Sequence, residues 1–253
     1  MVRAISLIVN ADDLGASRGI NEGIALCHRH GVVTSASLMV TGRAAAEAAL
    51  LSRDLPDLSV GLHWDVWGED EREFDLSDRA AVRDEFRRQL DRFHALMGRL
   101  PTHVDSHRHA HRRAGLLPLF QEMVEPLRVP LRGDGRVNHV GGFYAQWEWG
   151  VTDLDKVSVG FFCRLLEEEL RPGWNEISCH PGLPSPDFRS VYGDERVREV
   201  STLTDPRLVQ TLRALGIRLT SYAALSPSAP SVARGASLFP AGRERSSRSA
   251  GTR

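Results

Sequence analysis

The feature that most constrains the fold is an alternation of short apolar runs with segments of helical periodicity. Residues 5–10 form an uncharged run rich in β-branched side chains, which predicts a buried strand. Ser17 then precedes apolar residues at helical spacing and Gly31 follows them, so a capped helix is expected before a second strand at residues 32–40. A strand, a helix and a strand in this order are typical of a sheet with parallel strands.

This alternation continues along the chain and defines the fold class. Further strands are expected at residues 58–63, 101–105, 129–131, 175–179 and 217–221, and further helices at residues 44–53, 79–98, 116–127, 159–170 and 208–215. We therefore predict an α/β fold, namely a single-domain distorted (β/α) barrel that is TIM-like and has about seven parallel strands. A doubly wound open sheet is the main alternative, because a regular barrel has eight strands.

Composition bounds the domain organisation and the class of partner. Residues 226–253 are rich in Ser, Pro, Gly, Ala and Arg, so a disordered Ser/Pro/Arg-rich tail is expected there and the folded domain at residues 1–225. The 32 basic residues nearly balance the 33 acidic ones, which argues against nucleic acid or an anionic membrane as a partner. The apolar runs are too short to span a bilayer or to form a secretion signal, so a cytoplasmic protein is expected.

Three separated segments place metal-competent side chains directly after predicted strands. Asp12 and Asp13 follow the first strand, His63 ends another, and four of the ten histidines lie between His103 and His111. Because the C-terminal ends of barrel strands meet at one face, we expect these side chains to converge. One carboxylate with two imidazoles leaves positions open on a divalent ion, which makes water easier to deprotonate near neutral pH. The sequence thus predicts a hydrolytic metal site.

Each of these residues also has an ordinary structural explanation. An Asp-Asp pair after a strand is often a turn or a helix cap. A histidine that ends an apolar strand, such as His63, is often a satisfied core or rim residue. The alternating His107, His109 and His111 also fit one solvated face of a strand or a polar loop. Their combination at three strand ends favours the metal site.

Several motifs occur in order along the chain. They lie at residues 9–15 (VNADDLG), 31–35 (GVVTS), 61–63 (GLH), 101–111 (PTHVDSHRHAH) and 179–182 (CHPG). Together they resemble the YdjC-like carbohydrate deacetylase family, which includes chitooligosaccharide deacetylases and hopanoid-associated relatives. The resemblance runs from about Leu7 to Tyr222. It implies that residues 1–225 form a metal-dependent deacetylase barrel.

By matching position, the resemblance implies a role for each of five residues. Asp13, His63 and His107 are expected to bind one divalent metal ion, either Mg²⁺ or Zn²⁺, with other transition metals also open. Asp12 is expected to act as the general base on the attacking water. His180 in the Cys-His-Pro motif is expected to protonate the leaving amine or to stabilise the charged intermediate. A histidine that only ends its strand is the alternative.

Other polar residues are candidates for substrate contacts or for orienting the metal-binding side chains. Asp105 is expected to hold His107 or His180 in the right tautomer as a supporting partner. His109 and His111 are expected either to take such a supporting role, to contact substrate, or to lie at the surface. Arg132 is expected either to meet a substrate oxygen or the oxyanion, or to form a structural ion pair.

Aromatic side chains gather in one glycine-containing stretch. Phe143, Tyr144, Trp147 and Trp149 are expected either to stack on sugar rings or to pack a lid or a subunit contact.

These observations combine into one functional hypothesis. The expected protein is a metal-dependent hydrolase that removes an N-acetyl group from an acetylated amino sugar, oligosaccharide or glycolipid by attack of metal-activated water. A metal-dependent phosphoesterase or sugar isomerase on the same barrel, or a non-catalytic carbohydrate-binding protein, stays open because one fold serves many chemistries. The resemblance also suggests a homodimer.

Overall fold

The computed structural model describes residues 4–68, 73–113, 115–148, 150–186, 188 and 190–225. Its centre is a seven-stranded sheet in the order β4-β3-β2-β1-β8-β5, with β9 pairing to β1 beside this path. All of its strand pairs are parallel. The strands are β1 (Ile5–Leu14), β2 (Ser35–Leu38), β3 (Ser59–Trp64), β4 (Val104–Ser106), β5 (Asn138–Val140), β8 (Gly173–Cys179) and β9 (Arg218–Thr220).

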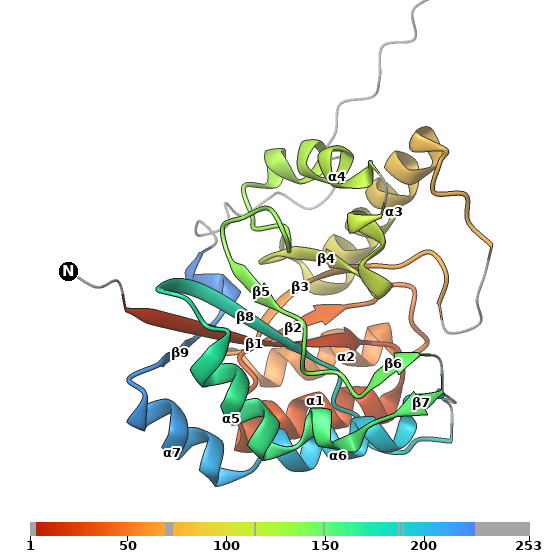
Figure 1. The fold of residues 1–253 in the computed structure, drawn as a ribbon. Helices are drawn as coiled ribbons and strands as arrows, with labels where there is room; N and C mark the ends of the chain where they lie inside the picture. The colour runs from red at the N-terminus through yellow and green to blue at the C-terminus, as the bar shows by residue number, and fades with distance from the viewer. Residues whose placement is uncertain are drawn as a thin grey trace, which may run out of the picture.

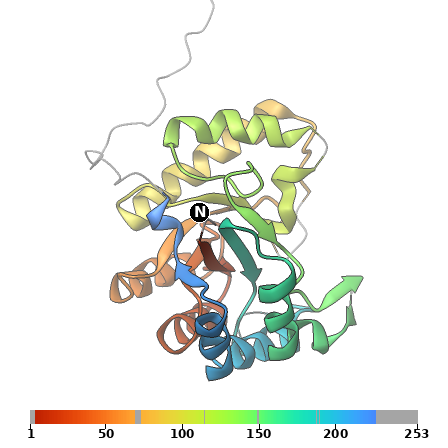
Figure 2. The same cartoon turned by 60° about the vertical axis from the view of Figure 1, so that its left-hand side comes forward.

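Helices cover the outside of this curled sheet. Figures 1 and 2 show α3 and α4 on one side of it and α1, α5, α6 and α7 on the opposite side. The helices are α1 (Arg18–His30), α2 (Ala45–Leu51), α3 (Arg79–Met97), α4 (Leu116–Val124), α5 (Val159–Glu168), α6 (Gly193–Leu203) and α7 (Pro206–Ala214). Short 3-10 helices are η1 (Ser52–Asp54), η2 (His107–Arg112), η3 (Glu125–Leu127), η4 (Leu154–Val157) and η5 (Tyr222–Ala224). The α/β class and the distorted, TIM-like barrel are therefore confirmed.

The predicted cap signals act as expected at α1, and α3 has caps of the same kind. Ser17 caps α1 by accepting a hydrogen bond from the backbone N–H of Ile20 at 3.2 Å, and Gly31 follows the last residue of that helix. Asp78 caps α3 in the same way, and Gly98 ends it in the left-handed conformation with φ 68°. These local signals fix where each helix leaves the sheet.

Side-chain alternation along the strands explains why the polar residues converge. In β1, Leu7, Val9 and Ala11 are fully buried in the large apolar core that includes side chains of the surrounding helices. The intervening residues point to the other face, so Asn10 and Asp12 line the inside of the curled sheet. The same alternation places His63, Asp105 and Glu176 inside as well, and the barrel interior becomes polar toward the C-terminal ends of its strands.

Several boundaries differ from the prediction. The strand expected at residues 32–40 is reduced to β2, and the one expected at residues 101–105 is β4, which begins and ends later. At residues 129–131 a single parallel bridge between Val104 and Leu131 takes the place of a strand. β4 is thus paired to β3 on one side and touches only this short segment on the other, and periodicity alone does not reveal the length of such pairing.

Four of the α-helices and strands were not predicted. One is α6, whose buried face carries Glu195, Arg196 and Glu199, so it lacks an apolar stripe. The second is β5, which lies at residues 138–140 and not at the expected 129–131. The other two, β6 (Gln146–Glu148) and β7 (Val151–Thr152), form a small antiparallel hairpin.

Two of the predictions concern residues outside the described ranges. Trp149 and the tail at residues 226–253 lie outside the described residues, so the expectations for them stay predictions. Across the described ranges, none of the helices combines the length and apolar character that a membrane crossing requires.

Candidate metal and catalytic site

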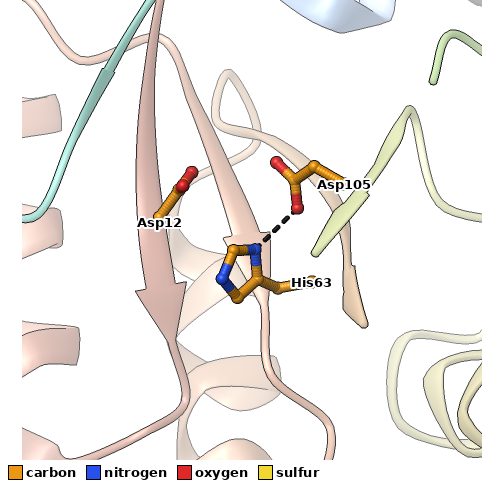
Figure 3. A group of neighbouring side chains, drawn as sticks. All are labelled: Asp12, His63 and Asp105. Atoms are coloured by element: carbon orange, nitrogen blue, oxygen red, sulfur yellow. Dashed lines mark hydrogen bonds and ion pairs between the residues drawn. The ribbon is translucent and has the colours of Figure 1, made fainter. Parts of the chain in front are cut away.

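The interior face of the sheet ends in a cluster of carboxylates and imidazoles. Asp12, His63 and Asp105 are buried, and each offers a ligand atom within 4.8 Å of those of the other two. Figure 3 shows the three side chains pointing toward one another from β1, β3 and β4. Such a group is able to hold a metal ion, as the convergence of strand ends predicted.

Asp13 adds a second carboxylate to this cluster at a bend of the chain. Its φ of 67° lies in the left-handed region, which marks a constrained position for a residue with a side chain. Oδ2 accepts a hydrogen bond from Arg196 at 2.7 Å, whereas Oδ1 is buried and has no hydrogen-bond partner within the described ranges. Burial raises the pKa of Asp13, but Arg196 and the nearby imidazoles outweigh it and hold that pKa well below its ordinary value. Asp13 thus presents an ionised oxygen with spare bonding capacity.

His63 lies between two carboxylates. Its Nδ1 is 2.6 Å from Oδ1 of Asp105, and its Nε2 is 3.3 Å from Oδ1 of Asp13. Burial alone would lower the pKa of His63, but Asp105 and Asp13 raise it well above its ordinary value. The space between Nε2 of His63 and Oδ1 of Asp13 therefore attracts positive charge, which is the property that a cation site needs.

His107 has the same kind of support from Asp65, so the prediction that Asp105 holds His107 or His180 is wrong: Asp105 contacts His63, its neighbour across the paired strands β3 and β4. Nδ1 of His107 lies 3.0 Å from Oδ1 of Asp65, and the ring centroid of His107 is 5.9 Å from that of His63. A proton on Nδ1 that is donated to Asp65 leaves a lone pair on Nε2, the form in which imidazole binds metals. Asp65 itself is fixed by the backbone N–H groups of Trp67 and Gly68.

Of the buried carboxylates, Asp13 has the oxygen best suited to an ion. Both oxygens of Asp12 accept hydrogen bonds from Arg132, at 2.7 and 2.8 Å. Oδ1 of Asp105 contacts His63, and Oδ2 of Asp105 lies 2.9 Å from Arg132. An ion would displace hydrogen bonds at Asp12 or Asp105, but at Oδ1 of Asp13 it would replace only the 3.3 Å contact with Nε2 of His63. The chemistry of this oxygen together with two imidazoles fits a divalent cation.

Arg132 organises the carboxylates from beneath the cavity. The residue is 1% exposed, and its guanidinium donates to Asp12 and Glu176 and contacts Asp105. Tyr222 donates its hydroxyl proton to Glu176 at 2.7 Å and completes the group. Burial alone would lower the pKa of Arg132, but the carboxylates raise it well above its ordinary value. Of the two expected roles of Arg132, this placement fits the structural ion pair.

His180 lies across the cavity from the metal-competent residues. Its Nε2 is 3.8 Å from Oδ2 of Asp12, and its backbone N–H donates to Glu199. Burial lowers the pKa of His180 to about 4, so its ring is neutral near neutral pH. Burial also acts on the pKa of Asp12, but the charge of Arg132 outweighs it and leaves that pKa lowered. Asp12 and His180 are therefore an ionised acceptor and a neutral imidazole within reach of one cavity.

The cavity above these groups has a volume of about 390 Å³ and one aromatic wall. The rings of Tyr144 and Tyr192 are stacked with centroids 4.6 Å apart and planes at 7°. The ring of His180 is tilted at 66° to that of Tyr144, with the two ring centroids 5.3 Å apart. Tyr192 is fixed because its hydroxyl accepts from the N–H of Ala145 and donates to Glu199. The cavity thus combines a polar floor with a flat aromatic surface.

The two remaining histidine candidates, His109 and His111, differ in their surroundings. His111 is fully buried, and its ring nitrogens bond to Ser106 and to the backbone carbonyl of Arg132. His109 lines the cavity, because it and Arg108 have φ values of 50° that turn η2 back toward the strand ends. His111 therefore supports the loop, whereas His109 is placed to meet a ligand.

Sequence reasoning missed four polar residues of this site. Asp65 lies two residues beyond His63 at the same strand end, and that spacing was the available signal. Arg196 and Glu199 belong to α6, which was itself not predicted, and Glu176 lies in the middle of a strand. Nothing local in the sequence marks Arg196, Glu199 or Glu176 as site residues.

A parallel barrel with carboxylates and imidazoles at the C-terminal ends of its strands defines the class of (β/α)-barrel proteins with a site suited to a metal ion. The sequence model for the YdjC-like protein matches residues 6–214. The chain belongs to the YdjC-like family.

Curated relatives agree with this assignment. A carbohydrate deacetylase of Geobacillus stearothermophilus is 33% identical over 240 residues, which cover 85% of this chain and 96% of that protein. A chitooligosaccharide deacetylase of Proteus mirabilis is 32% identical and covers 85% of this chain and 97% of that protein. The expected class, a hydrolase that acts on amide bonds, is confirmed.

Solved structures agree on the fold. A putative cellobiose-phosphate cleavage protein from Enterococcus faecalis superposes with a TM-score of 0.73 and 23% identity, covering 88% of this chain and all (100%) of that one. A polysaccharide deacetylase from Bacillus cereus superposes with a TM-score of 0.55 and 14% identity, over 86% of this chain and 92% of that one.

Proposed function

We propose that this protein removes the N-acetyl group from an acetylated amino sugar, as part of an oligosaccharide or a glycolipid, with one divalent ion held by Asp13, His63 and His107. The observation that carries the proposal is the buried, ionised Oδ1 of Asp13, which has no hydrogen-bond partner within the described ranges and lies 3.3 Å from Nε2 of His63. Both imidazoles have a carboxylate at Nδ1, which supports metal binding through Nε2.

The ligand types favour some ions over others. Two imidazoles and one carboxylate suit Zn²⁺ or another transition ion, whereas Mg²⁺ prefers oxygen ligands and keeps several waters. A bound divalent ion supplies Lewis-acid chemistry, because it polarises a carbonyl group and makes water easier to deprotonate near neutral pH. Zn²⁺, Mn²⁺, Co²⁺ and Ni²⁺ are therefore the ions to compare first.

In this proposal Asp12 takes the proton of the attacking water. Arg132 binds both of its oxygens and keeps the carboxylate ionised and fixed in direction. Proton uptake requires Asp12 to loosen one of these bonds, and Oδ2 is the oxygen nearer to His180. The positions of Asp12 and His180 at one cavity support general acid-base catalysis.

His180 then carries the proton to the leaving nitrogen. Its ring is neutral before the reaction, since burial lowers its pKa to about 4, and it lies 3.8 Å from Oδ2 of Asp12. A small movement of either group lets the proton pass from Asp12 to His180 and on to the amine. The balance is one water and one amide consumed, and acetate and a free amine released.

The cavity wall supports a sugar as the substrate. The stacked pair of Tyr144 and Tyr192 presents a flat apolar surface beside His180, and pyranose rings pack on such surfaces. The named activities of the relatives from Geobacillus stearothermophilus and Proteus mirabilis point to the same substrate class. A two-metal phosphoesterase is disfavoured, because Arg132 already binds the Asp12, Asp105 and Glu176 carboxylates that would have to bridge a second ion.

The proposal is tested by acetate release from N-acetylated chitooligosaccharides with each ion added to chelator-treated protein. Activity is expected to return with metal, Asp13→Asn to lose metal binding in calorimetry, and Asp12→Asn to bind metal but lose turnover. Asp91→Asn on the exposed face of α3 is the matched control. Full turnover by Asp12→Asn would remove Asp12 from the mechanism, and the absence of acetate release with every ion added would reject the substrate class.

A further inference from the structure

A second cavity lies at the other end of the barrel wall. It has a volume of about 530 Å³ and lies where β5 and β8 begin, beside the loop at residues 133–137. Its lining includes Arg112, Arg136, Arg171 and His139, and the apolar surfaces of Pro172 and Trp174. No aspartate or glutamate is among the described residues that line it.

The positive charge in this cavity is only partly compensated. Arg136 forms an ion pair with Asp134 at 2.6 Å. Arg112 donates to the uncharged His139 at 3.2 Å, and the guanidinium of Arg171 has no hydrogen bond or ion pair within the described ranges. Two guanidinium groups therefore remain without a carboxylate partner there.

One of these guanidinium groups, that of Arg112, lies close against the backbone at a glycine. Gly133 has φ 87°, and a Cβ at this position would lie 2.9 Å from Nε and 3.0 Å from Nη2 of Arg112. The close approach of Arg112 thus depends on a glycine. Burial, followed by the charge of Arg132, lowers the pKa of Arg112, which indicates a cation that lacks compensation where it lies.

This cavity is separate from the catalytic one. Along β8, Gly173 lines it and Ser178 lines the catalytic cavity, five residues further on, which corresponds to about 16 Å of strand. The cavities share no lining residue, although Nε2 of His139 lies 3.0 Å from Oγ of Ser178. A ligand here would not occupy the site of the proposed deacetylation.

We propose that this cavity binds a phosphate group, free or as the monoester of a small organic molecule, with Arg112 and Arg171 contacting its oxygens and Trp174 and Pro172 beside the organic part. Planar guanidinium groups match phosphate oxygens in geometry and charge. The absence of lining carboxylates among the described residues removes the repulsion that would oppose an anion. The apolar surface next to the charges favours a phosphomonoester over the free ion.

Calorimetric titration at low salt with inorganic phosphate and with glucose 6-phosphate tests the proposal, and glucose is the neutral control. Saturable binding of both anions is expected, tighter for glucose 6-phosphate. Arg171→Gln and Arg112→Gln are each expected to weaken binding at least about tenfold, the usual worth of a charge-assisted hydrogen bond. Arg213→Gln, on exposed α7, is expected to bind like the parent protein.

Three results would overturn this assignment. The first is the lack of saturable binding to either anion. The second is unchanged binding by Arg171→Gln, a variant that is expected to fold normally because Arg171 is exposed. The third is loss of phosphate binding in Asp13→Asn, because that loss would place the anion at the catalytic cavity. Retained binding in Asp13→Asn supports a separate site, whether or not the proposed deacetylation is correct.

Discussion

Replacing Arg132 by methionine tests how the carboxylates of this site are kept ionised. In the parent protein one buried guanidinium contacts Asp12, Asp105 and Glu176. Arg132→Met keeps most of the side-chain volume but removes the guanidinium that all three carboxyl groups share, and leaves His63 as the remaining cationic partner of Asp105. Breaking such a buried ion pair from one side costs about 3–5 kcal/mol, and a loss of this size is expected in the free energy of unfolding at pH 7.

The pH dependence of this loss is the more specific part of the prediction. With Arg132 present, the pKa values of Asp12 and Asp105 are lowered although burial opposes this. Their ionised forms therefore stabilise the folded state fully above pH 3.8, their ordinary pKa, and this stabilisation is lost as the pH falls through their lowered pKa values. Without Arg132 burial dominates and raises both pKa values. Stability then falls as pH rises above about 4, by up to about 1.4 kcal/mol per pH unit for each carboxyl group.

Urea unfolding of the parent and the variant between pH 4 and pH 8 measures this difference. The deficit of Arg132→Met is expected to shrink as the pH is lowered toward 4, because the carboxyl groups become protonated. Arg207→Met, which removes an exposed ion pair with Asp205, is the control and is expected to change little at any pH. A deficit below about 1 kcal/mol, or one that does not vary with pH, would refute this explanation of the ion-pair network.

Three further predictions concern neighbouring residues. Burial raises the pKa of Glu199 from 4.5 to about 8, so the parent protein loses stability as pH rises through this window. The melting temperature of Glu199→Gln should therefore exceed that of the parent by an amount that grows as pH rises from 4.5 to 8. A difference in melting temperature that stays constant over this range would contradict the prediction. Tyr144→Ala should raise KM for an acetylated chitooligosaccharide up to about tenfold with little change in kcat, and an unchanged KM would exclude ring stacking. Asp105→Asn frees Nδ1 of His63 and should weaken metal binding in calorimetry about 10–100-fold; unchanged affinity would mean that Asp105 does not orient His63.

The sequence predicts the fold where local signals and burial agree. β1 and β3 are buried on both faces and read as apolar runs, and the Ser17 and Gly31 signals mark helix ends that the structure has. In α6 the local sequence pattern and the burial disagree, because the buried residues Glu195, Arg196 and Glu199 interrupt the apolar stripe. Pairwise burial of charge is a tertiary property that periodicity does not report.

The candidate site shows the same division. Asp12, His63 and Asp105 could be placed together from their positions at strand ends, and the structure brings them within 4.8 Å. The support of His107 by Asp65 and of Asp13 by Arg196 depends on side-chain directions that only the fold determines. Position at a strand end thus predicts which residues meet, but not which hydrogen bonds they form.

We propose that Asp13, His63 and His107 bind one ion. The most direct measurement is an anomalous-scattering map from crystals of chelator-treated protein soaked with Zn²⁺. One strong peak is expected about 2.0–2.2 Å from Oδ1 of Asp13 and from Nε2 of each imidazole. A peak bonded instead to Asp12 and Asp105, or no peak near His63 at full Zn²⁺ saturation, would contradict this set of metal ligands.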